Sequence, residues 1–344
     1  MFAPRARGGW DCWLVLKAKW KDIFALLETF NHWLIFNVAL VAFLVLDLLV
    51  LTRNNREVRM KEAVWLTVFW TLVAGGVGVW IFVQGNNQQG IEYITGYIAE
   101  RALSIDNLFV FIVIFGYFSL PTQYQARGLL FGIVGALLAR ALFIAIGVAV
   151  ITAFSWFLFI LGAFLIYTAY KLASTGEQKV DPGNNIALKL FRRMIPVSND
   201  FDGTKFFTRN KGQWAATPFL LVVIVLATTD VVFAIDSIPT VFGITDDPFV
   251  VWTSNAMAVL GMRPLYFLLA GMIKLFRYLQ YGLALILGFI GLKMIVEEGF
   301  QGFHIFSELG DIYLSLTIII GVLIGSVMLS IIVPRADAIV ESDD

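Results

Sequence analysis

The chain has 344 residues, of which 59% are hydrophobic and 15% charged, and its formal net charge at pH 7 is zero. With a mean hydropathy of +0.81, this composition argues against a soluble protein and is typical of one that crosses a membrane several times. Lys and Arg are confined to a few clusters, so we expect no nucleic-acid partner. One cysteine, Cys12, excludes a disulfide within the chain, and two histidines, His32 and His304, are too few for a His-rich zinc or haem centre.

Residues 1–31 are expected to form an amphipathic segment that lies on the membrane surface. Trp10, Trp13 and Trp20 recur at helical spacing, opposite basic residues. A poorly ordered leader remains the alternative. We expect no cleaved signal peptide, because the first long apolar run begins near residue 33 and lacks an Ala-x-Ala site.

Nine apolar runs that are long enough to cross a bilayer follow this segment. They cover residues 33–51, 62–84, 91–118, 128–150, 154–173, 214–241, 252–273, 279–297 and 311–333. We therefore predict an all-α polytopic membrane protein with about nine transmembrane helices. An odd number of crossings places the two termini on opposite sides of the membrane.

The distribution of Lys and Arg predicts the orientation of these spans. Basic residues follow the first, third, fifth and seventh spans, whereas the outer connections between spans contain none. Because Lys and Arg gather on the cytoplasmic side, these basic connections and the C-terminus are predicted to be cytoplasmic. Only the N-terminal segment disagrees, since its basic residues would lie outside.

An acidic motif occurs twice inside predicted spans. The two copies are ERALSIDN at residues 100–107 and DVVFAIDS at residues 230–237. Each contains an acid, five intervening residues, a second acid and a small polar residue. The predicted orientation places the two copies on antiparallel helices, which indicates two inverted repeats of three helices.

Arginines in the fourth and seventh spans, Arg140 and Arg263, occupy corresponding positions and support the repeat. The predicted organisation has six parts: the amphipathic segment 1–31, two accessory helices in 32–90, the first repeat 91–173, a cytoplasmic linker 174–213 with short helices, the second repeat 214–297, and the last helix with its tail, 298–344.

A carboxylate at the centre of a membrane helix costs about 2.5–3.5 kcal/mol, so each of these acids is a candidate functional residue. Residues four and seven positions apart share a helix face. Glu100 therefore lies with Ser104 and Asn107, and Asp230 lies with Ser237. Each first acid thus shares its face with small polar side chains that could bind a cation.

The second acids, Asp106 and Asp236, point about 120° away from the first acids on a regular helix. They would join the same site if the helices were locally unwound, as transporter helices often are at repeat interfaces. Pro239 makes such a break plausible in the sixth span.

Charge indicates what such a site would bind. If the four acids share a cavity with Arg140 and Arg263, the net charge is minus two. A divalent cation would balance it, and oxygen ligands without Cys or His favour Mg²⁺, Ca²⁺ or Mn²⁺. Two protons would balance it equally well, as a metal-for-proton exchange requires. The arginines are interpreted as fixed counter-ions, and Asp47 as either a further supporting acid or a structural one. We expect no tightly bound cofactor.

With these residues in hand, the chain resembles the TerC family of bacterial and plastid integral membrane proteins over residues 91–333. The matching motifs are residues 100–107, Lys205-Phe206-Phe207, Ala216-Thr217-Pro218, residues 230–239, Asn255 and residues 260–266. The double acidic motif is the most specific of these. One position departs from the family pattern: many relatives carry a glutamate where this chain has Ala227.

The resemblance implies Mn²⁺ efflux across the inner (cytoplasmic) membrane, and the family is also associated with tellurite resistance and membrane-protein insertion. Our first hypothesis is a secondary transporter that exports Mn²⁺ in exchange for protons, with Asn255 as a supporting residue. The second is a non-transporting assembly factor. An enzyme is not expected, because no nucleophile with an adjacent base is visible. A homo-oligomer remains open.

Overall fold

The computed structural model describes residues 30–47, 49, 58–154, 156–175, 182–198, 200–210, 213–270, 278–299 and 308–332. The chain divides into two units, Met1–Arg53 and Asn54–Asp344, and each is considered by itself. In the first unit an apolar helix spans Phe30–Leu46, which overlaps the predicted first span, 33–51. Most of the N-terminal segment, the basic residues after the seventh span, His304 and the C-terminal tail lie outside the described residues.

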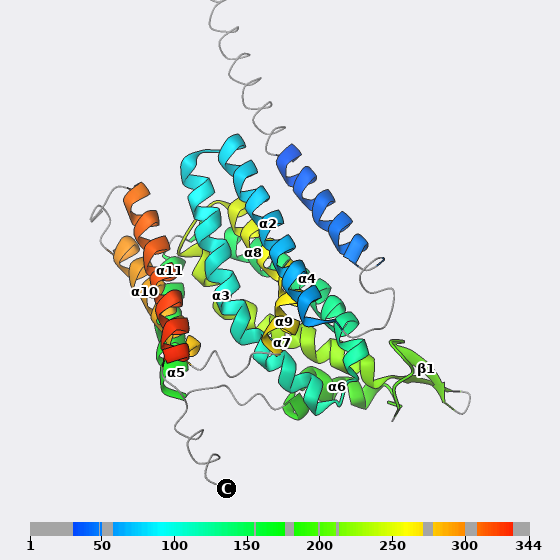
Figure 1. The fold of residues 1–344 in the computed structure, drawn as a ribbon. Coiled ribbons are helices and arrows are strands. Elements are labelled where there is room, and N and C mark those ends of the chain that lie inside the picture. Colours follow the sequence, from blue (N-terminus) through cyan, green and yellow to red (C-terminus); the bar gives the residue numbers. More distant parts are fainter. Residues whose placement is uncertain are drawn as a thin grey trace, which may run out of the picture. The chain divides into compact units, whose positions relative to one another are not determined.

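The second unit is largely helical, with one small hairpin (Figure 1). Its elements are α2 (Met60–Gln84), α3 (Asn87–Tyr117), α4 (Thr122–Ala153), α5 (Phe157–Thr175), η2 (Pro182–Asn184), α6 (Ile186–Met194), β1 (Phe207–Asn210), β2 (Gln213–Ala216), α7 (Pro218–Phe242), α8 (Pro248–Leu260), α9 (Met262–Ala270), α10 (Leu279–Gly299) and α11 (Glu308–Ile332).

Among the described residues, six helices are long and apolar enough to cross a membrane: α2, α4, α5, α7, α10 and α11. Helix α3 is also long, but every 18-residue stretch of it contains at least three of its four charged residues. The predicted class, a helical polytopic membrane protein, is confirmed.

Side-chain caps and prolines fix where several of these helices begin. The Asn86 side chain accepts a hydrogen bond from the Gln89 amide at the start of α3. Thr217 and Asp247 cap α7 and α8 in the same way, and a proline follows each cap. Such caps satisfy amide groups that have no partner within the helix, and proline at the first helical position loses no hydrogen bond.

The predicted seventh span is not one helix, because it is divided at Gly261 into α8 and α9. The cause is Pro264, which has no amide hydrogen to donate to the Leu260 carbonyl and whose ring would crowd that carbonyl. The break suggested for the sixth span was wrong, because α7 continues through Pro239 to Phe242, and α3 is also unbroken. The irregular backbone therefore belongs to the helix pair α8–α9.

Glycines allow α5 and α10 to approach each other closely. A Cβ atom placed on Gly291 would lie 2.7 Å from the Gly162 carbonyl oxygen, which is closer than real Cβ atoms come to other groups. Small residues at helix interfaces are the usual means of close packing in membranes, where the hydrophobic effect does not drive helices together.

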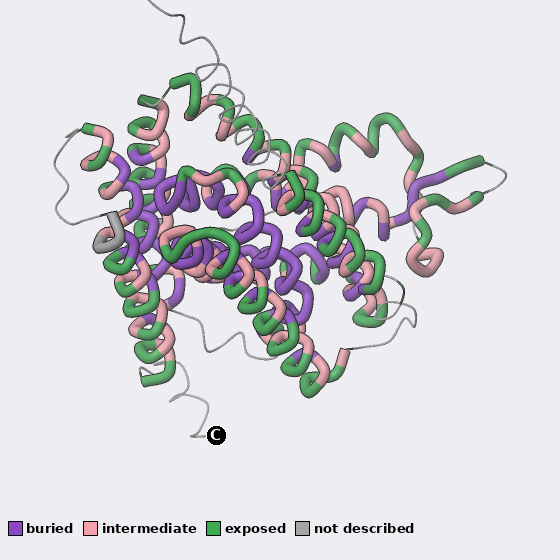
Figure 2. Tube along the Cα trace, turned by 90° about the horizontal axis from the view of Figure 1, so that it is seen from above, coloured by how far each residue is buried: buried purple, intermediate pink, exposed green. Residues whose placement is uncertain are grey.

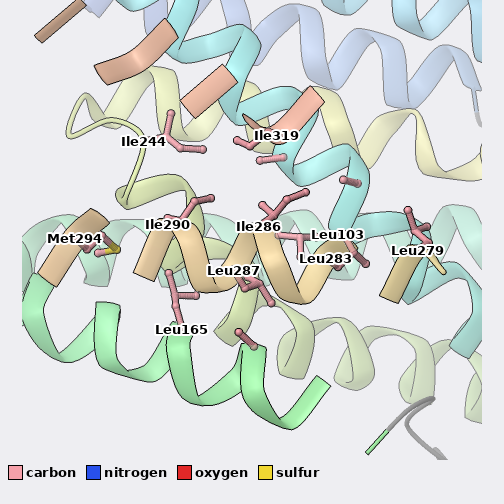
Figure 3. Packing of buried hydrophobic residues seen from close by; sticks show 13 residues of the cluster. Leu103, Leu165, Ile244, Leu279, Leu283, Ile286, Leu287, Ile290, Met294 and Ile319 are labelled. Atoms are coloured by element: carbon pink, nitrogen blue, oxygen red, sulfur yellow. The ribbon is translucent and has the colours of Figure 1, made fainter. Parts of the chain in front are cut away.

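A hydrophobic cluster joins α5 and α10 to α3 and α11. It contains Leu103 of α3, Leu165 of α5, Ile319 of α11 and several residues of α10. Figure 3 shows the α10 side chains between those of α3 and α5. This cluster lies beside α3, one of the two helices that carry the acidic motif.

Buried residues gather in the interior of the second unit, and exposed residues follow the outside of several helices (Figure 2). Many of the exposed residues are large and apolar. Trp65, Leu72 and Val83 of α2 are exposed, as are Ile324 and Ile332 of α11. Contiguous exposed apolar faces are unusual in soluble proteins and are expected where a helix faces lipid.

The linker between α5 and α7 contains the short helix α6 and a two-stranded antiparallel hairpin, β1–β2. The predicted short helix is present, whereas the hairpin was not predicted, since its strands are only four residues long. Phe206 stacks on Phe219 with ring centroids 5.9 Å apart, which fixes the base of the hairpin to α7.

The approach of α5 and α10 predicts different results for two glycines one turn apart. Gly291→Ala should lower the free energy of unfolding by about 1–3 kcal/mol, because its methyl group overlaps Gly162. Gly288→Ala is the matched control, since its Cβ would stand 3.7 Å from Ala169 and meet only ordinary contact. Thermal unfolding in detergent measures both, and equal stability of the two variants would contradict the packing described.

Candidate functional site

A single arginine, Arg140 of α4, joins both acidic helices. Its Nη1 donates to Glu100 Oε2 of α3 at 2.6 Å, and its Nε lies 3.4 Å from Asp230 Oδ2 of α7. Nη1 also donates to Asn255 Oδ1 of α8 at 2.6 Å. We call Glu100, Arg140, Asp230 and Asn255 the Arg140 cluster.

The Arg140 cluster is deep inside the protein. Arg140, Glu100 and Asn255 are 0% exposed and Asp230 is 1% exposed. Glu100 and Asp230 both lie near the middle of their helices. Because α7 is long and apolar enough to cross a membrane, the cluster is expected near the middle of the bilayer, where a charge is costly and must find a partner.

Small residues let the four helices pack closely around the Arg140 cluster. A Cβ on Gly132 of α4 would lie 3.2 Å from Leu226 of α7, and one on Gly96 of α3 would lie 3.1 Å from Ser254 of α8. These two contacts flank Arg140 and Asn255. The backbones of α3, α4, α7 and α8 are therefore close enough for the Arg140 guanidinium of α4 to reach side chains on the other three helices.

Several buried oxygen atoms of the two acidic helices lack a hydrogen-bond partner among the described residues. In the part of the chain that the structure describes, no hydrogen bond reaches these four buried atoms: Glu100 Oε1, Ser104 Oγ, Asp230 Oδ1 and Ser237 Oγ. Arg140 Nη2 is also without one. Leaving a buried polar atom unsatisfied costs about 1–3 kcal/mol, so a group of them indicates either a ligand site or bound water.

These four oxygens belong to two helix faces that the sequence predicts. Ser104 follows Glu100 by one turn of α3, and Ser237 follows Asp230 by two turns of α7. Asn107, on the same face of α3, is also buried. Helices α3 and α7 are in contact with each other.

The second acids of the motif lie apart from the first. Asp236 accepts a hydrogen bond from Thr168 of α5 at 3.4 Å, and Lys171 attracts its carboxylate. Asp106 is half-buried on α3. Since α3 and α7 are regular helices, residues six positions apart cannot point the same way. The structure does not bring the four carboxylates into one cavity.

Arg101 has a role that the sequence did not predict. Its Nη1 donates to the Ala258 carbonyl in the last turn of α8 at 3.0 Å. A cation at this end of a helix is stabilised by the helix dipole. Gly261 provides the space, because a Cβ there would overlap the Arg101 guanidinium. Arg101 thus fixes the end of the helix that carries Asn255.

A second buried acid of α3 was also missed, although its place at the start of an apolar span was a signal. Glu92 accepts hydrogen bonds from Thr245 at 2.5 Å and from Gln88 at 3.0 Å, so both of its oxygens are satisfied. Gln89 donates to Asp247 at 2.6 Å nearby. These bonds join the start of α3 to the loop between α7 and α8, away from the Arg140 cluster.

Two predicted residues remain. Arg263 is buried on α9, beyond the break at Gly261, and Asp47 is buried in the other unit of the chain. Within the described ranges, no three Asp, Glu, His or Cys side chains are close enough together to hold a metal ion. Any cation at the Arg140 cluster would therefore depend on two carboxylates together with hydroxyl or amide oxygens.

Comparison with known proteins identifies one family. The model of the integral membrane protein TerC family matches residues 85–338, which include the Arg140 cluster. No solved structure matches the chain.

Curated relatives cover most of the chain. A Myxococcus xanthus protein named uncharacterized membrane protein STKORF319 is 39% identical over 303 residues, which are 88% of this chain and 92% of the relative. "Putative membrane-bound redox modulator Alx" of Escherichia coli K12 is 38% identical over 84% of this chain and 90% of its own length. The thylakoid membrane protein TERC of Arabidopsis thaliana is 44% identical over 72% of this chain and 64% of its own length.

The Arg140 cluster predicts a large effect of removing the arginine. Arg140→Gln leaves two buried carboxylates without their cation and should lower the free energy of unfolding by about 3–5 kcal/mol. Adding Glu100→Gln and Asp230→Asn should recover part of this loss. Arg127→Gln, nearer the start of α4, is the control and should cost less. Thermal unfolding measures all of them, and a loss that the acid substitutions leave unchanged would count against the cluster.

Proposed function

Because the chain belongs to the TerC family of integral membrane proteins, we propose that it is a secondary transporter that exports a divalent cation, Mn²⁺ first of all, from the cytoplasm in exchange for protons. The unpartnered oxygens beside Arg140 are the observation that carries this proposal. Hydroxyl and carboxylate oxygens are the ligands that Mn²⁺, Mg²⁺ and Ca²⁺ prefer.

The composition of the site suits cargo that must be released. Two carboxylates with a neighbouring hydroxyl would bind a divalent cation less tightly than the three or more acids of a resident metal site. A transport site has to be favourable enough to fill and weak enough to empty. Weak binding by few acids would therefore suffice for transport, although the described residues contain no group of three acids.

Proton exchange follows from the charge of the cluster. Glu100 and Asp230 carry two negative charges against the one positive charge of Arg140, so the cluster has a net charge of minus one when both acids are ionised. An unbalanced buried charge costs several kcal/mol. The empty cluster should therefore take up a proton and release it when the cation binds.

Helix contacts support the proposed inverted repeats, α3–α5 and α7–α10. A two-fold axis would exchange α3 with α7, α4 with α8–α9, and α5 with α10. The contact of α4 with α7 then corresponds to the contact of α8 with α3, and both are extensive. The contacts α3–α7 and α5–α10 would each lie on such an axis, and both are present. The proposal retains nine membrane crossings, and α8 and α9 together form one of them.

The second candidate is a non-transporting factor for membrane-protein assembly or tellurite stress. The bonds of Arg140 to three helices favour it, because a buried ion pair can simply fix how helices pack. The name of the Alx relative suggests a redox role. This chain has one cysteine, Cys12, and therefore no pair of thiols for such a role.

The transport proposal is tested in proteoliposomes that contain the purified chain. Mn²⁺ movement should drive protons the opposite way, and an imposed pH gradient should change the Mn²⁺ flux. Glu100→Gln and Asp230→Asn should each abolish the flux, because each removes an ionised ligand. Glu92→Gln is the matched control, since Glu92 is a buried acid of the same helix whose oxygens are both hydrogen-bonded elsewhere.

Two outcomes would separate the candidates. Loss of Mn²⁺ flux in the cluster variants but not in Glu92→Gln, with unchanged protein levels, supports transport. Absence of flux in the parent, or flux that is indifferent to all three substitutions, overturns the proposal and leaves the assembly role. Intracellular Mn measured with and without expression gives the same comparison in cells.

A further inference from the structure

The helices around the Arg140 cluster have two ends with different surroundings. At one end lie the linker and the start of α7, where Phe206 stacks on Phe219. At the other lie the start of α3 and the loop between α7 and α8, where the Gln89 side chain donates to Asp247 at 2.6 Å. We call these the linker end and the loop end. The charge distribution predicts that the linker end is cytoplasmic.

Between the cluster and the linker end, the helices are apolar. Three stretches contain no polar or charged residue: 108–116 of α3, 129–139 of α4 and 219–227 of α7. They also pack tightly, since a Cβ placed on Gly132 would lie 3.2 Å from Leu226, and one on Gly135 would lie 2.8 Å from Ala227. This layer offers a cation no side-chain oxygen, so the structure is closed toward the linker end.

Toward the loop end, α3 and α7 run antiparallel in a register that two contacts define. Glu92 accepts a hydrogen bond from Thr245 at 2.5 Å. One turn farther along α3, a Cβ placed on Gly96 would lie 3.5 Å from Val241. Four residues on one helix thus match four on the other, because both helices rise equally per residue.

A buried oxygen continues from the cluster in this direction. One further turn of the same register places Ser237 at the level of Glu100. The Ser237 hydroxyl is 2% exposed, and no hydrogen bond from the described residues reaches it. Asp230 lies about 10 Å farther from the loop end, because seven residues separate it from Ser237 on α7. Ser237 is therefore on the loop-end side of the cluster.

Helix α8 brings a second hydroxyl to the same side. Ser254 precedes Asn255 of the cluster, and a Cβ placed on Gly96 would lie 3.1 Å from Ser254 Oγ. Because Gly96 has no side chain, the Ser254 hydroxyl meets the backbone of α3. Its hydrogen is donated to the Val251 carbonyl at 3.2 Å, which leaves the oxygen lone pairs to bind a cation.

The loop end is acidic where the start of α3 meets the start of α8. Asp247 caps α8, and Asp246 precedes it. Burial and the nearby charge of Glu298 raise the pKa of Asp246, while Lys293 opposes this change. Acidic side chains at the mouth of a site attract cations. The charge at this end therefore favours a cation that moves from the cluster toward the loop.

We propose that the cation leaves the Arg140 cluster toward the loop end along the interface of α3 with α8, past Gly96 and the Ser254 hydroxyl. This inference rests on the transport function proposed above and adds a route to it. Glu92 is not a ligand on this route, since both of its oxygens are hydrogen-bonded. The interface is packed, so α8 has to shift away from α3 for the ion to pass. Its separation from α9 at Gly261 allows such a shift.

The route is tested by the reactivity of a cysteine at Ser254 in the full chain. Ser254→Cys is made in a Cys12→Ser background, and a membrane-impermeant trimethylammonium methanethiosulfonate is added to one side of the membrane at a time. The thiol should react from the loop-end side while the chain transports Mn²⁺. Lys205→Cys, at an exposed position of the linker, identifies the opposite side.

Ala74→Cys is the matched control for burial. Ala74 of α2 is 1% exposed, and its carbonyl accepts a hydrogen bond from Tyr93 of α3. It therefore lies beside α3 near the level of Gly96, at the interface with α2 instead of α8. Ser254→Cys should react at least about tenfold faster than Ala74→Cys, a difference equivalent to about 1.4 kcal/mol in barrier.

Modification of Ser254→Cys should also stop transport. The attached group fills the interface beside Gly96, so Mn²⁺ flux in proteoliposomes should fall to the level of vesicles without protein. Mn²⁺ bound at the Arg140 cluster, measured by electron paramagnetic resonance, should remain, because the modified residue is not one of its ligands. Ala74→Cys treated in the same way should keep its flux.

Three results would overturn the route in a chain that transports Mn²⁺. Ser254→Cys could react no faster than Ala74→Cys, it could react only from the linker side, or its modification could leave the Mn²⁺ flux unchanged. A parent that moves no Mn²⁺ is a distinct result, because it overturns the transport function and the route together.

Discussion

Burying an arginine inside a membrane requires anions at the same depth, because an unpaired charge there costs several kcal/mol of folding free energy. Arg140 meets this requirement with Glu100 and Asp230, which come from different helices, and with the Asn255 amide. The three partners fix α3, α7 and α8 around α4. The guanidinium satisfies only one oxygen of each carboxylate, so the ion pair that orders the helices also leaves buried oxygens without partners.

The rest of the second unit supports this arrangement. Glycines let α4 approach α7, and let α3 approach α8, closely enough for one guanidinium to reach across them. The break caused by Pro264 ends α8 soon after Asn255, and Arg101 holds that end through the Ala258 carbonyl. A discontinuous helix beside a charged cluster is common at the binding sites of secondary transporters, where irregular backbone is tolerated because it lines the site.

Much of this could be predicted from the sequence, because apolar length and intramembrane acids are strong signals. The pattern predicted the class, the positions of most spans and the two faces that carry Glu100 with Ser104 and Asp230 with Ser237. It could not show that Arg140 contacts the first acid of each motif and that Asp236 turns to Thr168, since helix periodicity defines faces but not their neighbours. The break was assigned to Pro239 rather than Pro264, because a proline can lie inside a helix or end it.

The central claim is that the unpartnered oxygens beside Arg140 bind a divalent cation. Electron paramagnetic resonance of Mn²⁺ added to the purified chain tests it directly, because free and protein-bound Mn²⁺ give different signals. The account predicts bound Mn²⁺ in the parent and a weaker bound signal in Ser104→Ala, where the Arg140 ion pairs remain, because Ser104 lies one turn from Glu100. A bound signal that neither Ser104→Ala nor Glu100→Gln nor Asp230→Asn changes, or a parent that binds no Mn²⁺, would contradict the claim.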